Sequence, residues 1–335
     1  MRLIPRLAFA LSVAAFAAVI SPIVTAQSSP FVGSWNMTGT GADSSFVYWL
    51  EVKETDGKLT GSFLNRVGNP SALGSVKVEN GELVFQAGNA ERLNGPEYRA
   101  RLEGDKLIGR HTLRTGGRSG ARPVGNTGAE PVAGERVINW VGTRRPVFPK
   151  SDANAEHKYG TPVVLFDGKT MDAFGVQRAD SPWFWGVVDG ILTDVPPANN
   201  LVSKEKFGDF KLEMEYRLGN GSNSGLYLRG RYELQLLDDR GQPPAILGHM
   251  AIYGRKAASV NASRPPYQWQ EVTVILVGDR VTVTLNGQRV QDNSVIEGIT
   301  GGALDNDELA PGPIMIQGDH SLVHIRKLVV TPIVK

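Results

Sequence analysis

The chain has 335 residues, with 36 Lys and Arg against 34 Asp and Glu, a formal net charge of +2 and 41% hydrophobic residues. This length allows two or three domains with cores of their own, and the nearly balanced charge argues against a nucleic-acid partner. The sequence contains no cysteine, which excludes disulfides, thiolate metal sites and cysteine nucleophiles.

The N-terminus has the pattern of a secretory signal peptide. Arg2 and Arg6 precede an apolar run over 7–20, and Val24-Thr25-Ala26 provides the small residues of a cleavage site. The run is short for a membrane anchor, which needs about 20 apolar residues. We therefore expect residues 1–26 to be removed, the mature protein to be periplasmic or secreted, and no membrane span to remain.

Residues 27–145 predict a first domain built from short strands. Three strand–turn–strand units follow one another, with tight turns at Asp56-Gly57, Asn80-Gly81 and Gly104-Asp105. Such pairs are typical of two-residue hairpin turns. Repeated hairpins predict a β-meander that closes as a small antiparallel β-barrel or sandwich.

Two polar segments separate the strand-rich parts. Residues 115–135 are rich in Gly, Pro and polar side chains, and we expect a surface loop there. Residues 146–160 contain Pro146 and Pro149 and few apolar residues, which indicates a linker.

Residues 161–335 predict a second all-β domain. No segment shows helical periodicity over ten or more residues. Nine short apolar or alternating runs predict a two-sheet jelly-roll sandwich, and they cover 163–166, 183–188, 191–194, 209–218, 224–229, 231–237, 270–277, 280–285 and 323–331.

The strand expected over 231–237 has an unusual polar face. Leu234 and Leu236 share one face, and Glu233 and Gln235 share the other, because alternate residues of a strand point the same way. Glu and Gln are poor strand formers. Two of them side by side predict a polar floor such as a carbohydrate groove, with an ordinary solvent-facing strand as the alternative.

Other residues of this domain are candidates for the same surface. Glu213 and Glu215 alternate with apolar residues in the strand 209–218, and we expect one sheet to present them together with Glu233 and Gln235. Aromatic residues stack on sugar rings or fill the core; those in this domain include Trp183, Trp185, Tyr227, Tyr253, Tyr267 and Trp269.

His320 is the histidine best placed for chemistry, because it follows the apolar run 314–316 and enters a loop. Glu233, Asp238 and His320 can hold a divalent metal ion only if the fold brings them together, because no tightly spaced metal-binding motif is present in the sequence. Carboxylate and imidazole ligands suit Mn²⁺, Ca²⁺ or Zn²⁺. We expect no nucleotide cofactor: the P-loop pattern is absent, and the Gly-rich segment 220–225 joins two strands rather than opening a helix.

The whole of 161–335 resembles the 3-keto-disaccharide hydrolase family, also described as 3-keto-glucoside 1,2-lyase/3-keto-2-hydroxyglucal hydratase. The resemblance rests on the order of many short motifs and does not cover residues 27–150. The motifs are Leu165-Phe166-Asp167-Gly168-Lys169, Trp185-Gly186-Val187-Val188-Asp189-Gly190-Ile191-Leu192, Phe207-Gly208-Asp209-Phe210-Lys211-Leu212-Glu213, Asn223-Ser224-Gly225, Arg229-Gly230, Tyr232-Glu233-Leu234-Gln235, Ala251-Ile252-Tyr253-Gly254, Trp269, Leu285-Asn286-Gly287 and Gln317-Gly318-Asp319-His320.

The resemblance implies a concanavalin-like jelly roll over 161–335 and an exported enzyme that cleaves small 3-keto-glycosides by elimination and hydration. On residue type and motif position, we expect Glu233, His320 and Arg229 to be catalytic, with Glu233 and His320 also the candidate ligands of one divalent metal ion. The expected substrate-binding residues are Gln235, Glu213, Asn223, Tyr253, Trp269 and Asp238.

Two other functions are compatible with the same fold. One is a carbohydrate-binding module without catalytic activity. The other is a glycoside hydrolase with two carboxylates, in which Glu213 or Glu215 pairs with Glu233 across about 5–9.5 Å.

Overall fold

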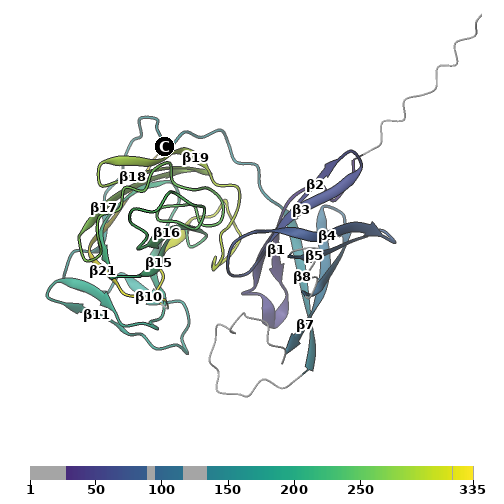
Figure 1. Cartoon of the computed structure of the whole chain (residues 1–335), viewed down its shortest axis with the longest axis horizontal. Helices are drawn as coiled ribbons and strands as arrows, with labels where there is room; N and C mark the ends of the chain where they lie inside the picture. Colours follow the sequence, from purple (N-terminus) through teal and green to yellow (C-terminus); the bar gives the residue numbers. More distant parts are fainter. Residues whose placement is uncertain (1–27, 89–94, 116–133, 319, 335) are drawn as a thin grey trace, which may run out of the picture.

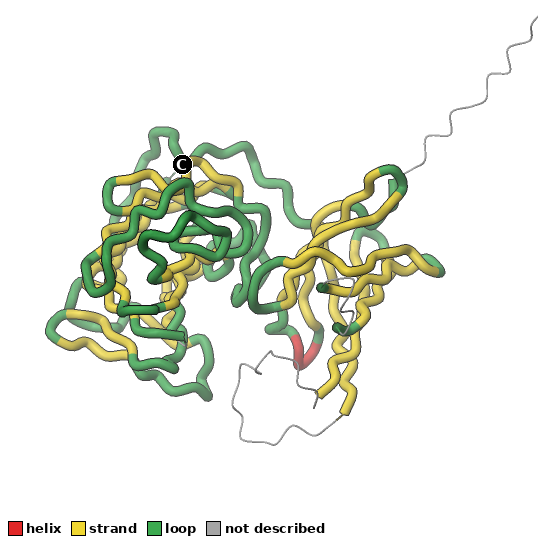
Figure 2. The backbone as a smooth tube through the Cα atoms, viewed as in Figure 1, coloured by secondary structure: helices red, strands yellow, loops and turns green. Residues whose placement is uncertain are grey.

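The computed structural model describes residues 28–88, 95–115, 134–318 and 320–334, and within them the chain is almost entirely strand and loop (Figures 1 and 2). A single 3-10 turn, η1 (Gly41–Asp43), interrupts this pattern. The expected signal peptide and most of the expected 115–135 loop lie outside the described residues. Within the described residues, no helix is long and apolar enough to cross a membrane.

The N-terminal unit is a closed antiparallel barrel of eight strands, in which β1 pairs with both β2 and β8. This confirms the predicted small β-barrel. Asp56, Gly57, Asn80 and Gly81 all have positive φ, as a type I′ hairpin turn requires. The strands are β1 (Gly33–Gly39), β2 (Val47–Thr55), β3 (Lys58–Asn65), β4 (Ser71–Glu79), β5 (Glu82–Ala87), β6 (Glu97–Glu103), β7 (Lys106–Thr115) and β8 (Gly134–Arg144).

Aromatic side chains fill the inside of the barrel. Phe63 and Phe85 lie against Tyr98 at ring-centroid distances of 4.7 and 4.9 Å. The Trp140 ring lies so close to the backbone of Gly109 that a Cβ there would sit 2.2 Å from it. Small eight-stranded barrels have just enough room for such side chains, and this interior is a packed core.

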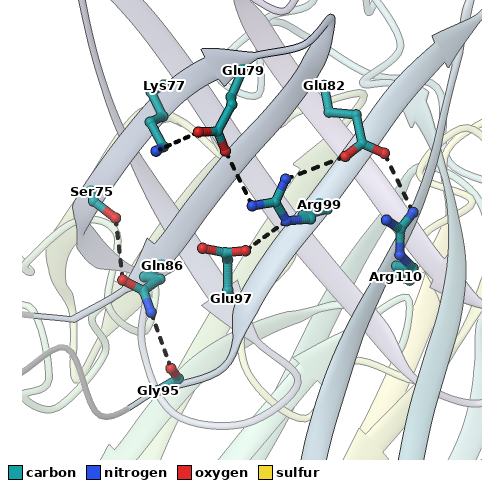
Figure 3. Close-up of polar contacts among 9 residues, drawn as sticks. All are labelled: Ser75, Lys77, Glu79, Glu82, Gln86, Gly95, Glu97, Arg99 and Arg110. Carbon is teal, nitrogen blue, oxygen red and sulfur yellow. Dashed lines mark hydrogen bonds and ion pairs between the residues drawn. The ribbon is translucent and has the colours of Figure 1, made fainter.

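The outer face of β4 to β7 carries alternating charges (Figure 3). Arg99 bonds to Glu79 at 3.2 Å, to Glu82 at 3.4 Å and to Glu97 at 2.6 Å, and Glu82 also bonds to Arg110 at 3.4 Å. Exposed pairs of this kind stabilise a fold only slightly. These charges of opposite sign are therefore largely paired with one another.

The second unit is a sandwich of two antiparallel sheets. One sheet has the order β10-β13-β20-β15-β16, and the other has the order β11-β12-β21-β14-β17-β18-β19 with β9 also paired to β21. This confirms the predicted all-β sandwich. Its strands are β9 (Val163–Phe166), β10 (Phe174–Val176), β11 (Trp185–Val188), β12 (Ile191–Asp194), β13 (Leu201–Phe207), β14 (Phe210–Leu218), β15 (Asn223–Leu228), β16 (Tyr232–Leu237), β17 (Gln270–Val277), β18 (Arg280–Leu285), β19 (Gln288–Val295), β20 (Gly312–Ile316) and β21 (Val323–Pro332).

The two units share part of one hydrophobic core. Val47, Trp49 and Leu64 of the barrel belong to the same buried cluster as the residues packed between the two sheets. The guanidinium of Arg255 lies over the Trp49 ring, 4.0 Å from its centroid. The barrel is therefore fixed against the sandwich and is not a tethered module.

A further ionic contact joins the units. The Glu308 side chain is fully buried and bonds to Arg145, where the barrel ends, with Nε 3.1 Å from Oε1. Asn36 of β1 donates to the same oxygen at 2.8 Å, and Tyr232 of β16 donates to Oε2 at 3.0 Å. Strands of both units thus meet at one buried carboxylate.

Asp194, at the end of β12, makes the stability of the sandwich depend on pH. Its Oδ1 accepts the Val323 N–H at 2.7 Å, whereas Oδ2 is buried with no hydrogen-bond partner among the described residues. Burial raises the pKa of Asp194 to about 7, from about 3.9 in an unfolded chain. The folded state therefore binds this proton more tightly than the unfolded chain does. The contribution of this difference to the free energy of unfolding is fully present below the unfolded pKa and is lost as the pH rises through the folded pKa of about 7.

We expect Asp194→Asn to remove this loss, because the amide carries no charge at any pH. Relative to wild type, the variant's free energy of unfolding should rise by roughly 2–4 kcal/mol between pH 4 and pH 8. Urea unfolding at both pH values measures the difference. The control is Asp189→Asn in the adjacent exposed turn, and equal pH dependence of wild type and Asp194→Asn would contradict the prediction.

Candidate functional site

Glu233 and Gln235 form the centre of the site on the face of β16 that points away from the core. Each is only 4% exposed, so the alternative of a solvent-facing strand is wrong. Tyr227 of β15 lies opposite Glu233 and its hydroxyl donates to Glu233 Oε2 at 3.0 Å. In the amide orientation that satisfies both of its polar atoms, Gln235 donates to Glu233 Oε1 at 3.2 Å and to the Ser224 carbonyl at 2.9 Å.

The Tyr227 hydroxyl has two acceptors within reach but one proton to donate. The second acceptor is the carbonyl of Gly301, at 2.8 Å. When the Tyr227 hydroxyl donates its proton to the Gly301 carbonyl, it has no proton left for Glu233. The contact between Tyr227 and Glu233 is then a hydrogen bond only if the Glu233 carboxyl group is protonated and donates to the Tyr227 oxygen. Tyr227 therefore fits both the ionised and the protonated form of Glu233, as a group that gives and takes a proton requires.

Gly225 makes room for the Glu233 carboxylate. A Cβ at this position of β15 would lie 2.4 Å from Glu233 Oε1 and 2.9 Å from the Tyr227 ring. Even alanine would push the carboxylate away from its partners. The Asn223-Ser224-Gly225 motif thus ends in glycine because the acidic group needs that space.

Tyr253 lies beside the same carboxylate. Its backbone N–H donates to the Glu233 carbonyl at 3.0 Å. Burial and the negative charge of Glu233 raise the pKa of the Tyr253 phenol. The hydroxyl therefore stays protonated at neutral pH and remains a hydrogen-bond donor.

His320 lies in the loop between β20 and β21, and both sides of this loop are attached to β15. The N–H of Gln317 donates to the Gly225 carbonyl at 3.0 Å. Ser321 Oγ accepts the Asn223 N–H at 2.5 Å and donates to the Asn223 carbonyl at 2.9 Å. The exposed His320 is therefore held at the Asn223 end of the polar face, and residue 319 lies outside the described residues.

Two expected substrate-binding residues lie on the other side of the sandwich. Glu213 is on the outward face of β14, in the eight-stranded sheet, where it pairs with Lys211 at 3.1 Å. Trp269 lies just before β17 of the same sheet, between the guanidinium groups of Arg217 and Arg326, which are 4.9 and 4.4 Å from its ring centroid. The expectation that one sheet presents Glu213 and Glu215 with Glu233 is wrong, because the two strands belong to different sheets.

Arg229 is directed to other partners. Its guanidinium donates to the carbonyls of Gly208 and Gly278 at 2.8 and 3.0 Å and to Asp209 at 2.6 Å. These residues lie in the β13–β14 and β17–β18 turns, so the side chain crosses the end of the sandwich instead of reaching Glu233. The structure gives Arg229 an anchoring position rather than the expected catalytic one.

Asp238 also has a structural contact, because its Oδ2 accepts the Gly221 N–H at 2.8 Å. Among the described residues, no group of three or more His, Cys, Asp or Glu side chains is arranged to hold a metal ion. The metal held by Glu233, Asp238 and His320 stays a prediction.

Sequence reasoning placed Tyr227 only among the aromatic residues that stack on sugars or fill the core, and it did not place Thr300 in the site. Thr300 Oγ accepts the Glu233 N–H at 2.8 Å and donates to the Arg231 carbonyl at 3.1 Å. The signal for Tyr227 was present: β15 and β16 are joined by a short turn, and the resulting register sets Tyr227 opposite Glu233. Thr300 carried no such signal, because it is far from β16 in sequence.

A family model described as a 3-keto-alpha-glucoside-1,2-lyase-like domain matches residues 161–331, which is half of the chain. The chain belongs to this family. The match covers all the strands of the sandwich except the last residue of β21 and leaves out the barrel. Glu233, Tyr227, Gln235 and Tyr253 therefore all lie within the 3-keto-glucoside lyase-like domain.

Individual relatives are more distant. A curated protein of Bacteroides thetaiotaomicron named 3-keto-disaccharide hydrolase is 24% identical over 165 residues, which cover 38% of this chain. The chain spans 57% of the length of that relative. A crystal structure of a glycosyl hydrolase candidate from Parabacteroides distasonis is 27% identical, with a TM-score of 0.44, and covers 51% of this chain and 84% of that one. A second from the same organism is 18% identical, with a TM-score of 0.42, and covers 52% and 94%.

Proposed function

We propose that this protein is an exported carbohydrate-active enzyme that cleaves 3-keto-glycosides by elimination followed by hydration, a net hydrolysis. The observation that carries the proposal is the Glu233 carboxylate, 4% exposed and in hydrogen-bond contact with Tyr227, within a 3-keto-glucoside lyase-like domain. The relative from Bacteroides thetaiotaomicron, named 3-keto-disaccharide hydrolase, supports the substrate class. Export rests on the signal-peptide pattern of residues 1–26.

The chemistry follows from the ketone. A keto group at C3 acidifies the hydrogen on C2, so a base removes that proton, the C1–O bond breaks and a C1=C2 double bond forms. The departing oxygen takes a proton from an acid. In the second step water adds back, with its oxygen bonding to C1 and a proton to C2, which restores both catalytic groups to their starting protonation states.

We assign these roles to residues of the polar face. His320 removes the C2 proton, and Glu233 protonates the departing oxygen and then receives a proton from the attacking water. Tyr227 hydrogen-bonds to Glu233 in both protonation states. Tyr253 donates to the oxygen of the developing enolate, in place of the expected Arg229, since its raised pKa keeps the hydroxyl protonated.

A divalent metal ion would stabilise the enolate as a Lewis acid, but the described residues do not provide a set of ligands that fits one. The effect of a chelator on turnover tests the metal prediction directly.

The two alternative functions have less support. A binding module would need a platform of several exposed aromatic rings on the polar face. Tyr227 is 2% exposed, Tyr253 is only partly exposed, and Trp269 lies between two arginines on the other sheet. A glycosidase that pairs Glu233 with Glu213 or Glu215 would need both carboxylates on one surface, and they lie on different sheets.

The deciding experiment compares a 3-keto-disaccharide with its non-oxidised parent, each with and without a chelator, and follows sugar release and 2-hydroxyglucal formation. We expect turnover of the keto compound alone, with the glucal as a transient product. Loss of activity with the chelator would establish a metal. Equal turnover of both sugars, or binding of either without turnover, would contradict the proposed reaction.

A further inference from the structure

The polar face around Glu233 is covered at one end by the barrel, through the turn between β3 and β4. We define this turn, residues 66–70, as the wall turn. One contact path runs from Glu233 to Tyr227 and on to the Gly301 carbonyl. The next residue, Gly302, donates its N–H to the carbonyl of Arg66 in the wall turn at 2.8 Å.

A second path reaches the other half of the wall turn. Tyr253, beside Glu233, is followed by Gly254, and a Cβ on Gly254 would lie 2.5 Å from the Asn69 Cβ and 2.9 Å from Pro70. Likewise, a Cβ on Gly301 would lie 2.0 Å from the carbonyl oxygen of Gly68. The sandwich thus presents glycines at the points where the wall turn approaches it, as close backbone contact requires.

The wall turn is also fixed from its own side. The guanidinium of Arg66 lies over the Phe46 ring, 3.5 Å from its centroid. Within the turn, Val67 is 50% exposed and Asn69 is exposed. These two side chains therefore remain accessible while the backbone of the turn is held, and Asn69 is the one that lies next to Gly254, the residue after Tyr253.

The opposite end of the face is different. Asn223 is partly exposed and His320 is exposed, whereas Tyr227 and Gly301 are buried under the wall turn. The wall turn therefore covers the Tyr227 end of the face, whereas the Asn223 end is open to solvent.

We infer that the barrel is a specificity element of the active unit: the wall turn closes one end of the site, so that the site accepts the terminal sugar of a substrate and excludes internal units of a chain. This inference rests on the proposed function for its substrate, and it adds a role for residues that the family match does not cover. Val67 and Asn69 are the specificity-determining positions.

The test changes bulk at the two exposed positions. Val67→Trp and Asn69→Trp should lower kcat/KM for a 3-keto-disaccharide at least tenfold, mainly by raising KM, because the added bulk stands where the terminal sugar meets the wall turn. Wild type should not cleave a trisaccharide that carries the keto group on its internal unit, and the double variant Val67→Ala/Asn69→Ala should allow this trisaccharide to react. The controls are Val78→Trp and Val78→Ala, since Val78 is a comparably exposed valine (46%) on β4, outside the wall turn.

The outcomes separate the inference from the proposed function. If every folded wall-turn variant has a kcat/KM for the disaccharide within twofold of wild type and fails to cleave the internally oxidised trisaccharide, the inference is overturned and the reaction stays intact. If wild type turns over no keto-sugar, the proposed function fails, and calorimetric binding of non-oxidised disaccharide and trisaccharide then takes the place of kinetics. Binding that is absent or identical in wild type and variants would overturn the inference as well, whereas weaker disaccharide binding by the Trp variants would support it.

Discussion

Replacing Glu233 by Gln is expected to lower kcat on a 3-keto-disaccharide by about two to four orders of magnitude, the usual contribution of a positioned proton donor or acceptor. The amide has nearly the shape of the carboxyl group but neither gives nor takes the proton that the leaving oxygen needs. Steady-state kinetics on the keto compound measures the loss, and KM should change far less than kcat.

Two controls make this result specific. Glu213→Gln changes an equivalent side chain on the other sheet, where it pairs with Lys211, and it should leave kcat within about twofold because it touches no reacting group. Urea unfolding of Glu233→Gln should show that the fold persists. Retention of more than a tenth of the wild-type kcat by a folded Glu233→Gln protein would remove Glu233 from the mechanism.

The second large effect concerns stability. Glu308→Ala is expected to lower the free energy of unfolding by about 3–5 kcal/mol, as removal of one partner from a buried ion pair typically does. The substitution leaves the Arg145 guanidinium, the Asn36 amide and the Tyr232 hydroxyl without the acceptor that they share. Urea unfolding followed by tryptophan fluorescence measures the change.

Glu205→Ala is the matched control for this measurement, since Glu205 is an exposed residue of β13. We expect its effect to stay within about 0.5 kcal/mol. A loss below about 1 kcal/mol for Glu308→Ala would mean that the buried cluster at the junction contributes little.

Local sequence patterns predicted the strands well, but they did not predict which strands lie next to one another in a sheet. The alternation of Leu234 and Leu236 with Glu233 and Gln235 identified the polar face of β16, because a strand's period of two residues is a property of its backbone. The same reasoning applied to β14 identified the outward face of Glu213 correctly but not the sheet to which it belongs. Alternation distinguishes the two faces of one strand, whereas strand order depends on long-range pairing that no short segment encodes.

The prediction of the site was also limited because the same type of side chain can either contact a ligand or stabilise the fold. An arginine and a tryptophan in matching motifs suggest ligand contact, yet Arg229 joins two turns and Trp269 packs between two cations. Both arrangements depend on residues distant in sequence. The Pro-containing segment 146–160 likewise gave no sign that Trp49 would pack into the neighbouring unit.

The packing of Val47, Trp49 and Leu64 into the sandwich core has a consequence for how this protein is inherited. A gene fragment beginning at residue 161 would encode every strand of the sandwich but leave an apolar surface uncovered, which favours association with other molecules. Recombination that exchanged the barrel for another domain would meet the same penalty. The two units should therefore pass from ancestor to descendant as a pair, with changes at the junction arising together on both sides.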